Sequence, residues 1–365
     1  MWTWTPRRAL ESVSRGDDES PPRLLDQNDT LALKGAAILA IAFHNYFHLL
    51  SSAHENEFDC SGARFAEFLS TLQDPHQSVQ AAFSYLGHFG VQVFIFLSAY
   101  GLASRHWRTP AGPGFLRERL SKIYPAFLAV VITWAVLTGA ADGPFGSLAV
   151  LMANSKSLVL TLLGVSNVWP GLSFPPVGPW WFIPFIVQWY LLWPLVRRIT
   201  DRFGARGVMT IAAAGVFLMA TLGGLLHQQG INLMKTPLGH MPELCLGIMA
   251  ARFEAKLDRT RIILMAGGIF IAANLCPSLW LLGFPCATIV MVGSYIKVKG
   301  LLRRARPVLA HVGTSSMALF LVNGFVRFPF AGWAMQEKLW FVVLIAGIIS
   351  TGWSLAIAEL MPRSA

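Results

Sequence analysis

The sequence has 365 residues, of which 54% are apolar and only 13% are charged, whereas soluble globular domains devote about 25% of their residues to charge. This composition excludes an ordinary soluble domain and predicts an all-α protein that crosses a membrane many times. The formal net charge is +10, but the Lys and Arg residues fall in short clusters between apolar runs, as in the cytoplasmic loops of membrane proteins. We therefore expect the lipid bilayer as a partner of the chain, and no nucleic acid.

The first membrane-spanning run follows a polar tail. Residues 1–30 contain four arginines and no apolar signal-peptide region, so they predict a cytoplasmic tail. Residues 31–50 are apolar over the length of a span, yet they include Lys34, His44 and His48. Ionisable groups within a span mark functional sites, and a neutral imidazole can accept and return a proton near neutral pH. His44 is the candidate base; alternatively, both histidines lie in the headgroup layer without a chemical role.

The charges between the later apolar runs set their orientation. Residues 51–78 carry five acidic side chains against one arginine, which places the first loop outside the cell. The further helices are expected at about 80–103, 121–139, 179–196, 207–227, 241–253, 262–296 (two helices, broken at Cys276-Pro277), 308–328 and 339–360. Residues 145–165 predict an interfacial or re-entrant helix, because a full span there would put the next arginine cluster on the wrong side. The prediction is about ten transmembrane helices in one domain over residues 31–360, with a cytoplasmic tail at 361–365.

A basic cluster precedes the third predicted helix. The segment Phe115–Pro125, expected to be an inner loop, places Arg117, Arg119 and Lys122 within about one and a half helical turns. Arginine side chains suit phosphate oxygens, and a lysine adds a point charge. A nucleotide-bearing donor such as coenzyme A would use this cluster at the cytoplasmic face. The alternative is an ordinary basic loop of a membrane protein.

Three aromatic or polar residues belong to the fourth predicted helix. Trp181 is expected at the outer interface, where aromatic side chains anchor spans. Gln188 and Tyr190 lie deeper, and Gln188 requires a partner, for which a hydrogen bond between helices is the simplest explanation.

Other polar residues lie in later helices. Glu243 is predicted just inside the outer boundary, where it could orient His44 or accept a substrate hydroxyl, or could simply occupy a helix N-terminus. Ser315 and Asn323 share a helix, where polar contacts between helices are their default role. The four cysteines show neither metal-ligand nor disulfide spacing, so we expect no metal and no disulfide framework.

In this order, these motifs resemble the membrane-bound acyltransferase 3 family, over about residues 31–325. The motifs are Lys34-Gly35 followed by His44, Phe96-Leu97-Ser98, Arg119 with Lys122-Ile123-Tyr124-Pro125, Trp181-Phe182 with Gln188-Trp189-Tyr190, Pro242-Glu243, and Gly313 with Ser315-Ser316. The resemblance implies transfer of an acyl group, commonly acetyl, from cytoplasmic acyl-CoA to sugars of envelope polysaccharides.

The resemblance also implies roles for individual residues. His44 becomes the histidine of the family's first helix, and Arg119 and Lys122 become the pair that meets the donor. Lys34 stands where the family usually has arginine, so we include it among the donor-binding residues. Ser98 belongs to a motif that Ala99-Tyr100 interrupts here, and Asn323 occupies a position where histidine is frequent.

We therefore expect a bacterial inner-membrane O-acyltransferase with both termini in the cytoplasm and no further domain after its last helix. Acetyl-CoA is the expected donor substrate, a glycan or lipid-linked sugar the expected acceptor, and His44 the general base. Two alternatives remain open. One is a proton-coupled transporter with His44 and Glu243 as a relay, and the other is a non-catalytic partner of a glycan assembly machine.

Overall fold

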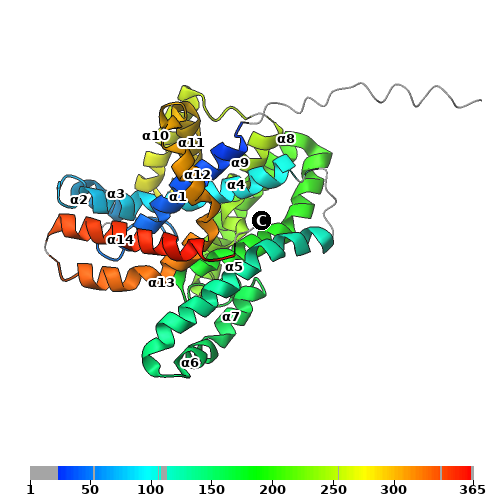
Figure 1. Ribbon diagram of the computed structural model, residues 1–365. Coiled ribbons are helices and arrows are strands. Elements are labelled where there is room, and N and C mark those ends of the chain that lie inside the picture. Colours follow the sequence, from blue (N-terminus) through cyan, green and yellow to red (C-terminus); the bar gives the residue numbers. More distant parts are fainter. Residues whose placement is uncertain are drawn as a thin grey trace, which may run out of the picture.

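The computed structural model describes residues 24–51, 54–105, 107, 113–253, 255–337 and 339–362. These residues form helices joined by short 3-10 turns, and no strand occurs among them, which confirms the all-α prediction (Figure 1). The helices are α1 Gln27–Phe47, α2 Gly62–Thr71, α3 Ser78–Leu86, α4 Gly90–Arg105, α5 Pro113–Gly139, α6 Gly146–Ala153, α7 Ser155–Leu162, α8 Phe182–Gln228, α9 Met241–Arg252, α10 Thr260–Leu275, α11 Trp280–Val298, α12 Arg306–Thr314, α13 Ser316–Ala334 and α14 Trp340–Glu359.

Several of these helices are long and apolar enough to cross a membrane. Within the described residues there are seven such segments. The predicted number of about ten transmembrane helices is not confirmed. Helices α9 and α10 are shorter than a span, and one of the seven segments, Gly178–Gln228, is 51 residues long. That segment contains the runs predicted at 179–196 and 207–227, which meet at a kink where Gly204 has a φ of 59°. Glycine adopts this left-handed backbone conformation without a Cβ penalty.

Other boundaries can be compared with the prediction. The break predicted at Cys276-Pro277 is confirmed, because α10 ends at Leu275 and α11 begins at Trp280. The predicted interfacial helix at 145–165 is instead two short helices, α6 and α7, which meet at Asn154. Helix α1 begins at Gln27, inside the segment predicted as a tail. The rest of the two predicted tails, residues 1–23 and 363–365, lies outside the described residues.

Helix α1 runs through the centre of the bundle, where it packs against α12, α13, α3, α4 and α14 (Figure 1). Its first turn is anchored by Asp29, which is buried and lies 2.9 Å from Lys299 Nζ and 3.1 Å from Arg306. Tyr295 donates a further hydrogen bond to the same carboxylate. Because a buried carboxylate is tolerated only when paired, this network fixes the start of α1. We call this end of the bundle, where α1 begins, the basic end. The opposite end, where α1 ends, is called the far end.

Candidate functional site

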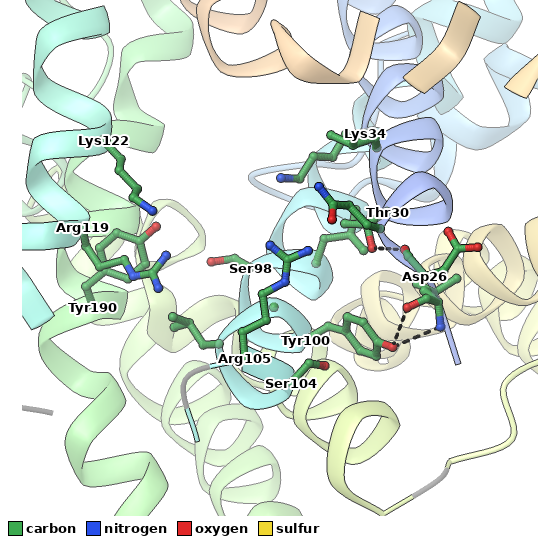
Figure 2. Close-up of a pocket in the computed structure, with 16 residues that line it drawn as sticks. Asp26, Thr30, Lys34, Ser98, Tyr100, Ser104, Arg105, Arg119, Lys122 and Tyr190 are labelled. Atoms are coloured by element: carbon green, nitrogen blue, oxygen red, sulfur yellow. Dashed lines mark hydrogen bonds between the residues drawn. The ribbon is translucent and has the colours of Figure 1, made fainter. Parts of the chain in front are cut away.

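A cleft of about 270 Å³ lies at the basic end between α1, α4, α5 and α8. Its basic side chains come from three helices and point toward a common space in Figure 2: Lys34, Arg105, Arg119 and Lys122. Asp26 also lines the cleft, but its carboxylate lies 2.7 Å from Arg306 and is neutralised by it. The cleft is therefore cationic and suits an anionic ligand.

Helix α5 separates the three basic residues that the sequence places together. The helix begins at Pro113, so the predicted inner loop is helical. Arg119 and Lys122 are three residues apart and share a face, whereas Arg117 is rotated by roughly 200° from Arg119 about the helix axis. Arg117 lies in a separate groove on α5 beside Leu120 and Tyr124. Of the three predicted donor-binding residues on α5, Arg119 and Lys122 line the cleft and Arg117 does not.

The Arg119 guanidinium has unused hydrogen-bonding capacity. Its side chain is 14% exposed, and Glu118 lies 3.8 Å away, beyond hydrogen-bond distance. Two of its nitrogens, Nε and Nη2, are buried without a hydrogen-bond partner among the described residues. Unpaired buried donors cost free energy, so this arrangement favours a bound acceptor such as a phosphate. Tyr190, predicted from the sequence, lines the cleft beside Arg119 (Figure 2).

Arg105 is a member of the cleft that the sequence analysis missed. It lies in the last turn of α4, seven residues after Ser98, and both residues line the cleft. Residues seven apart on a helix share a face, so the helical spacing from Ser98 could have identified it. The helix expected at about 80–103 ends before Arg105, so the residue was not assigned to that helix face.

His44 lies toward the far end of α1 and is 6% exposed. Its Nδ1 atom lies 2.9 Å from the carbonyl oxygen of Ser84. Because a carbonyl only accepts hydrogen bonds, Nδ1 carries the proton, and the neutral ring keeps its lone pair on Nε2. Gly87 permits this close approach of the two segments, since a Cβ there would lie 2.7 Å from the His44 Cβ and 2.6 Å from the Ala40 oxygen. The imidazole is therefore held in the tautomer that a general base requires.

Other titratable side chains surround His44. The ring centroids of His48 and His88 lie 5.3 and 5.6 Å from that of His44. Glu55, from the loop after α1, lies 2.8 Å from His48 Nδ1. Burial alone would raise the pKa of Glu55, but its contact with His48 and the nearby imidazoles of His44 and His88 hold that pKa below its usual value. Glu55 thus supplies a negative charge beside His44. The sequence analysis missed this, because it treated Glu55 only as a loop charge.

Glu243, the second predicted catalytic residue, does not contact His44 among the described residues. It is fully buried and lies 3.1 Å from Nδ1 of His240, three residues earlier at the start of α9. His240 Nε2 donates to the carbonyl oxygen of Met234 at 2.8 Å, so the carboxylate and Nδ1 must share one further proton. Ring contacts lead from His240 through Phe284 and Phe89 to His88, one of the histidines near His44. Glu243 therefore orients His240.

The fourth predicted helix holds its aromatic and amide groups inside the protein. Trp181 is 5% exposed and packs against Phe182 and Phe185, which differs from the expected interfacial anchor. Gln188 bonds to Asn167 at 2.7 Å and to the Gly164 carbonyl at 2.9 Å. The partners of Gln188 therefore lie in the segment that follows α7, and not in another membrane-spanning helix as expected.

Asn323 links three helices, as the sequence predicts for polar contacts between helices. Its Oδ1 accepts from Asn45 of α1 at 3.2 Å, and its Nδ2 contacts Ser354 of α14 at 3.5 Å. Ser315 is buried at the junction of α12 and α13, and its hydroxyl has no hydrogen-bond partner among the described residues. All four cysteines are free, and Cys245 and Cys286 are buried.

Together the fold and the site define a multi-pass membrane protein in which one helix joins a cationic cleft to a buried histidine. The sequence profile of the acyltransferase 3 family, described as an acyltransferase domain, matches residues 32–359. The chain belongs to the acyltransferase 3 family, and this membership supports acyltransferase activity in a membrane. Among curated proteins and among solved structures, nothing matches the chain.

Proposed function

We propose that the protein is an O-acyltransferase of the bacterial inner membrane that moves an acetyl group from acetyl-CoA to a hydroxyl of an envelope or exopolysaccharide sugar. In this proposal, the basic end and both termini face the cytoplasm. The observation that supports it most is the convergence of four basic side chains on one cleft, at the start of the helix that also carries His44. An anionic donor would bind at one end of α1 and react toward the other.

The donor's charged portion suits the cleft. Ligand pockets commonly measure about 300–1,000 Å³, so a cleft of about 270 Å³ suits the phosphate groups and not the whole of coenzyme A. His44 follows Lys34 by ten residues on α1, which is roughly 15 Å along the axis at 1.5 Å per residue. The pantetheine arm of coenzyme A is an extended chain. It would carry the thioester from the basic end into the bundle toward His44.

The proposed chemistry requires one proton carrier. His44 Nε2 takes the proton from the acceptor hydroxyl as the oxygen attacks the thioester carbonyl and the new C–O bond forms. The C–S bond then breaks, and the departing thiolate takes the proton from the imidazolium to leave as the free thiol of coenzyme A. Glu55 stabilises the intermediate imidazolium through its negative charge. No metal or redox step is needed for this balance.

The transporter hypothesis receives less support. It requires a proton relay between His44 and Glu243, but Glu243 pairs with His240. The ring contacts that lead from His240 to His88 pass through the apolar rings of Phe284 and Phe89, which carry no proton. The alternative of a non-catalytic partner predicts no donor site, whereas Lys34 and Lys122 both line the cationic cleft.

Transfer of labelled acetyl tests the proposal. Membranes with the protein would be incubated with acetyl-CoA carrying an isotopic label in the acetyl group, and the envelope glycans would be analysed by mass spectrometry. We expect the labelled acetyl mass on glycan hydroxyls only in membranes that contain the protein. Unchanged acetylation together with altered export of the glycan would support a transporter or an assembly partner instead.

A further inference from the structure

Three potential metal ligands meet at the far end of α1. The ligand atoms of His44, His48 and Glu55 all lie within 4.8 Å of one another, and His48 Nδ1 lies 2.8 Å from Glu55. His44 and His48 are four residues apart, so they share a helix face. A tetrahedral ion with ligands at about 2.0–2.2 Å requires its ligand atoms about 3.3 Å apart. The separations of up to 4.8 Å exceed this value by at most about 1.5 Å, so changes in the side-chain torsion angles would bring the three ligand atoms together.

The surroundings of His44 already have the form found around metal-bound histidines. Such a histidine usually donates its second ring N–H to a carboxylate or backbone carbonyl, which fixes the tautomer and the ring orientation. The Nδ1 atom of His44 makes this contact with the Ser84 carbonyl at 2.9 Å. The Nε2 atom consequently keeps its lone pair, which is available for an ion.

We propose that His44, His48 and Glu55 bind one divalent transition-metal ion of the Zn²⁺ type at the far end of the bundle. Imidazole ligands suit Zn²⁺, whereas Mg²⁺ and Ca²⁺ prefer oxygen ligands alone. The ring centroid of His54 lies 4.8 Å from that of His48, outside the group of three ligand residues. Sequence spacing led us to expect no metal, because it does not reveal that Glu55 folds back onto α1.

The ion would inhibit the enzyme, and this consequence rests on the proposed function. The lone pair of His44 Nε2 that binds the ion is the same lone pair that accepts the proton of the acceptor hydroxyl. A metal-bound His44 cannot act as a general base. Occupation of the metal site and acyl transfer are therefore mutually exclusive.

Zinc titration of the full chain in nanodiscs tests the site. The protein is freed of metal with a chelator, the thiols of Cys60 and Cys276 are capped, and Zn²⁺ is added in a calorimeter. We expect one tightly bound ion per chain, and a loss of affinity of at least about tenfold in His48→Ala and in Glu55→Gln. The control is His76→Ala, which removes an exposed histidine away from the cluster. Its affinity should equal that of the parent protein.

Two further measurements exclude misfolding and separate this inference from the proposed function. Acetyl-CoA binding at the basic end reports the fold of each variant, and Zn²⁺ should raise the unfolding temperature of the parent protein but not of His48→Ala. No zinc binding by the parent, or equal binding by folded His48→Ala, would overturn the site. Zinc should also lower the transfer rate of the parent, reversibly with chelator, and leave the rate of His48→Ala at its zinc-free value. Zinc binding at the predicted residues without any transfer in metal-free protein would refute the proposed function and leave the metal site standing.

Discussion

The substitution Arg119→Ala should weaken the binding of acetyl-CoA, and Arg117→Ala should not. The two arginines are two residues apart on α5, but only Arg119 lines the cleft. Arg119 also has two buried nitrogens without a hydrogen-bond partner among the described residues, whereas Arg117 is exposed. The pair therefore separates a specific phosphate contact from the general positive charge of this end of the protein.

The expected magnitude follows from the contact that is lost. A hydrogen bond to a charged group contributes about 1.5–3 kcal/mol, and 1.4 kcal/mol corresponds to a tenfold change in affinity. Removal of the Arg119 guanidinium should therefore raise the Kd for acetyl-CoA by roughly 10- to 150-fold. Arg119→Lys keeps the charge but loses the bidentate geometry, so its effect should be intermediate.

Calorimetric titration of acetyl-CoA into purified protein in nanodiscs measures these differences. The salt dependence of Kd should become weaker in Arg119→Ala, because one screened ionic contact is gone. Arg117→Ala should remain within about threefold of the parent, which is less than the effect of one hydrogen bond to a charged group. Equal losses in Arg117→Ala and Arg119→Ala would mean that only the overall charge matters, and no loss in either would remove the cleft from donor binding.

Three other predictions concern packing, the buried acid and orientation. Gly87→Ala should lower the free energy of unfolding by about 1–3 kcal/mol and reduce acyl transfer, because the added Cβ would clash with His44. Thermal unfolding measures the loss of stability. The control Gly268→Ala should show no such loss, because its added Cβ meets nothing within 4 Å. Glu243→Gln and His240→Ala should each destabilise the protein by about 3–5 kcal/mol, since each leaves a buried partner uncompensated. The double variant should lose less stability than the sum of the two single losses. Additive losses in a double-mutant cycle would show that the pair is not coupled. A membrane-impermeant thiol reagent added to intact cells should label the exposed Cys276 and the half-buried Cys60, but not the buried Cys245 and Cys286. If Cys276 and Cys60 were labelled only after the cells are opened, the proposed orientation in the membrane would be reversed.

Much of the helical architecture could be predicted because apolar runs and loop charges depend on local sequence. The break before α11 and the positions of α1 and α14 follow from such runs, whereas the single helix expected at 308–328 is divided at Ser315 into α12 and α13. The runs predicted at 179–196 and 207–227 are likewise the two helical arms of α8, which meet at a kink where Gly204 has a non-helical backbone conformation. The number of spans did not follow, since α9 and α10 are shorter than a span.

The candidate site was predictable where its residues share one helix and less so where tertiary contacts bring them together. Lys34, Arg119 and Lys122 were identified from charge and resemblance, and all three line the cleft. Arg117 was grouped with them by its distance along the chain, but a step of two residues turns its side chain by roughly 200° from that of Arg119 about the axis of α5. Glu55 was missed, and Glu243 was assigned in its place, because the path of the loop after α1 is set by contacts with distant segments.

The most direct test of the central claim is the rate of acetyl transfer by His44→Ala in nanodiscs, measured beside its affinity for acetyl-CoA. Loss of a general base should reduce the transfer rate by about 10² to 10⁴. Donor affinity should stay unchanged, because the cleft lies at the other end of α1 and the lost interaction is made in the transition state. A folded His44→Ala protein that transfers acetyl at the parental rate would contradict the account. So would one that loses donor affinity, because donor binding and proton transfer would then not be separate functions of the two ends of the helix.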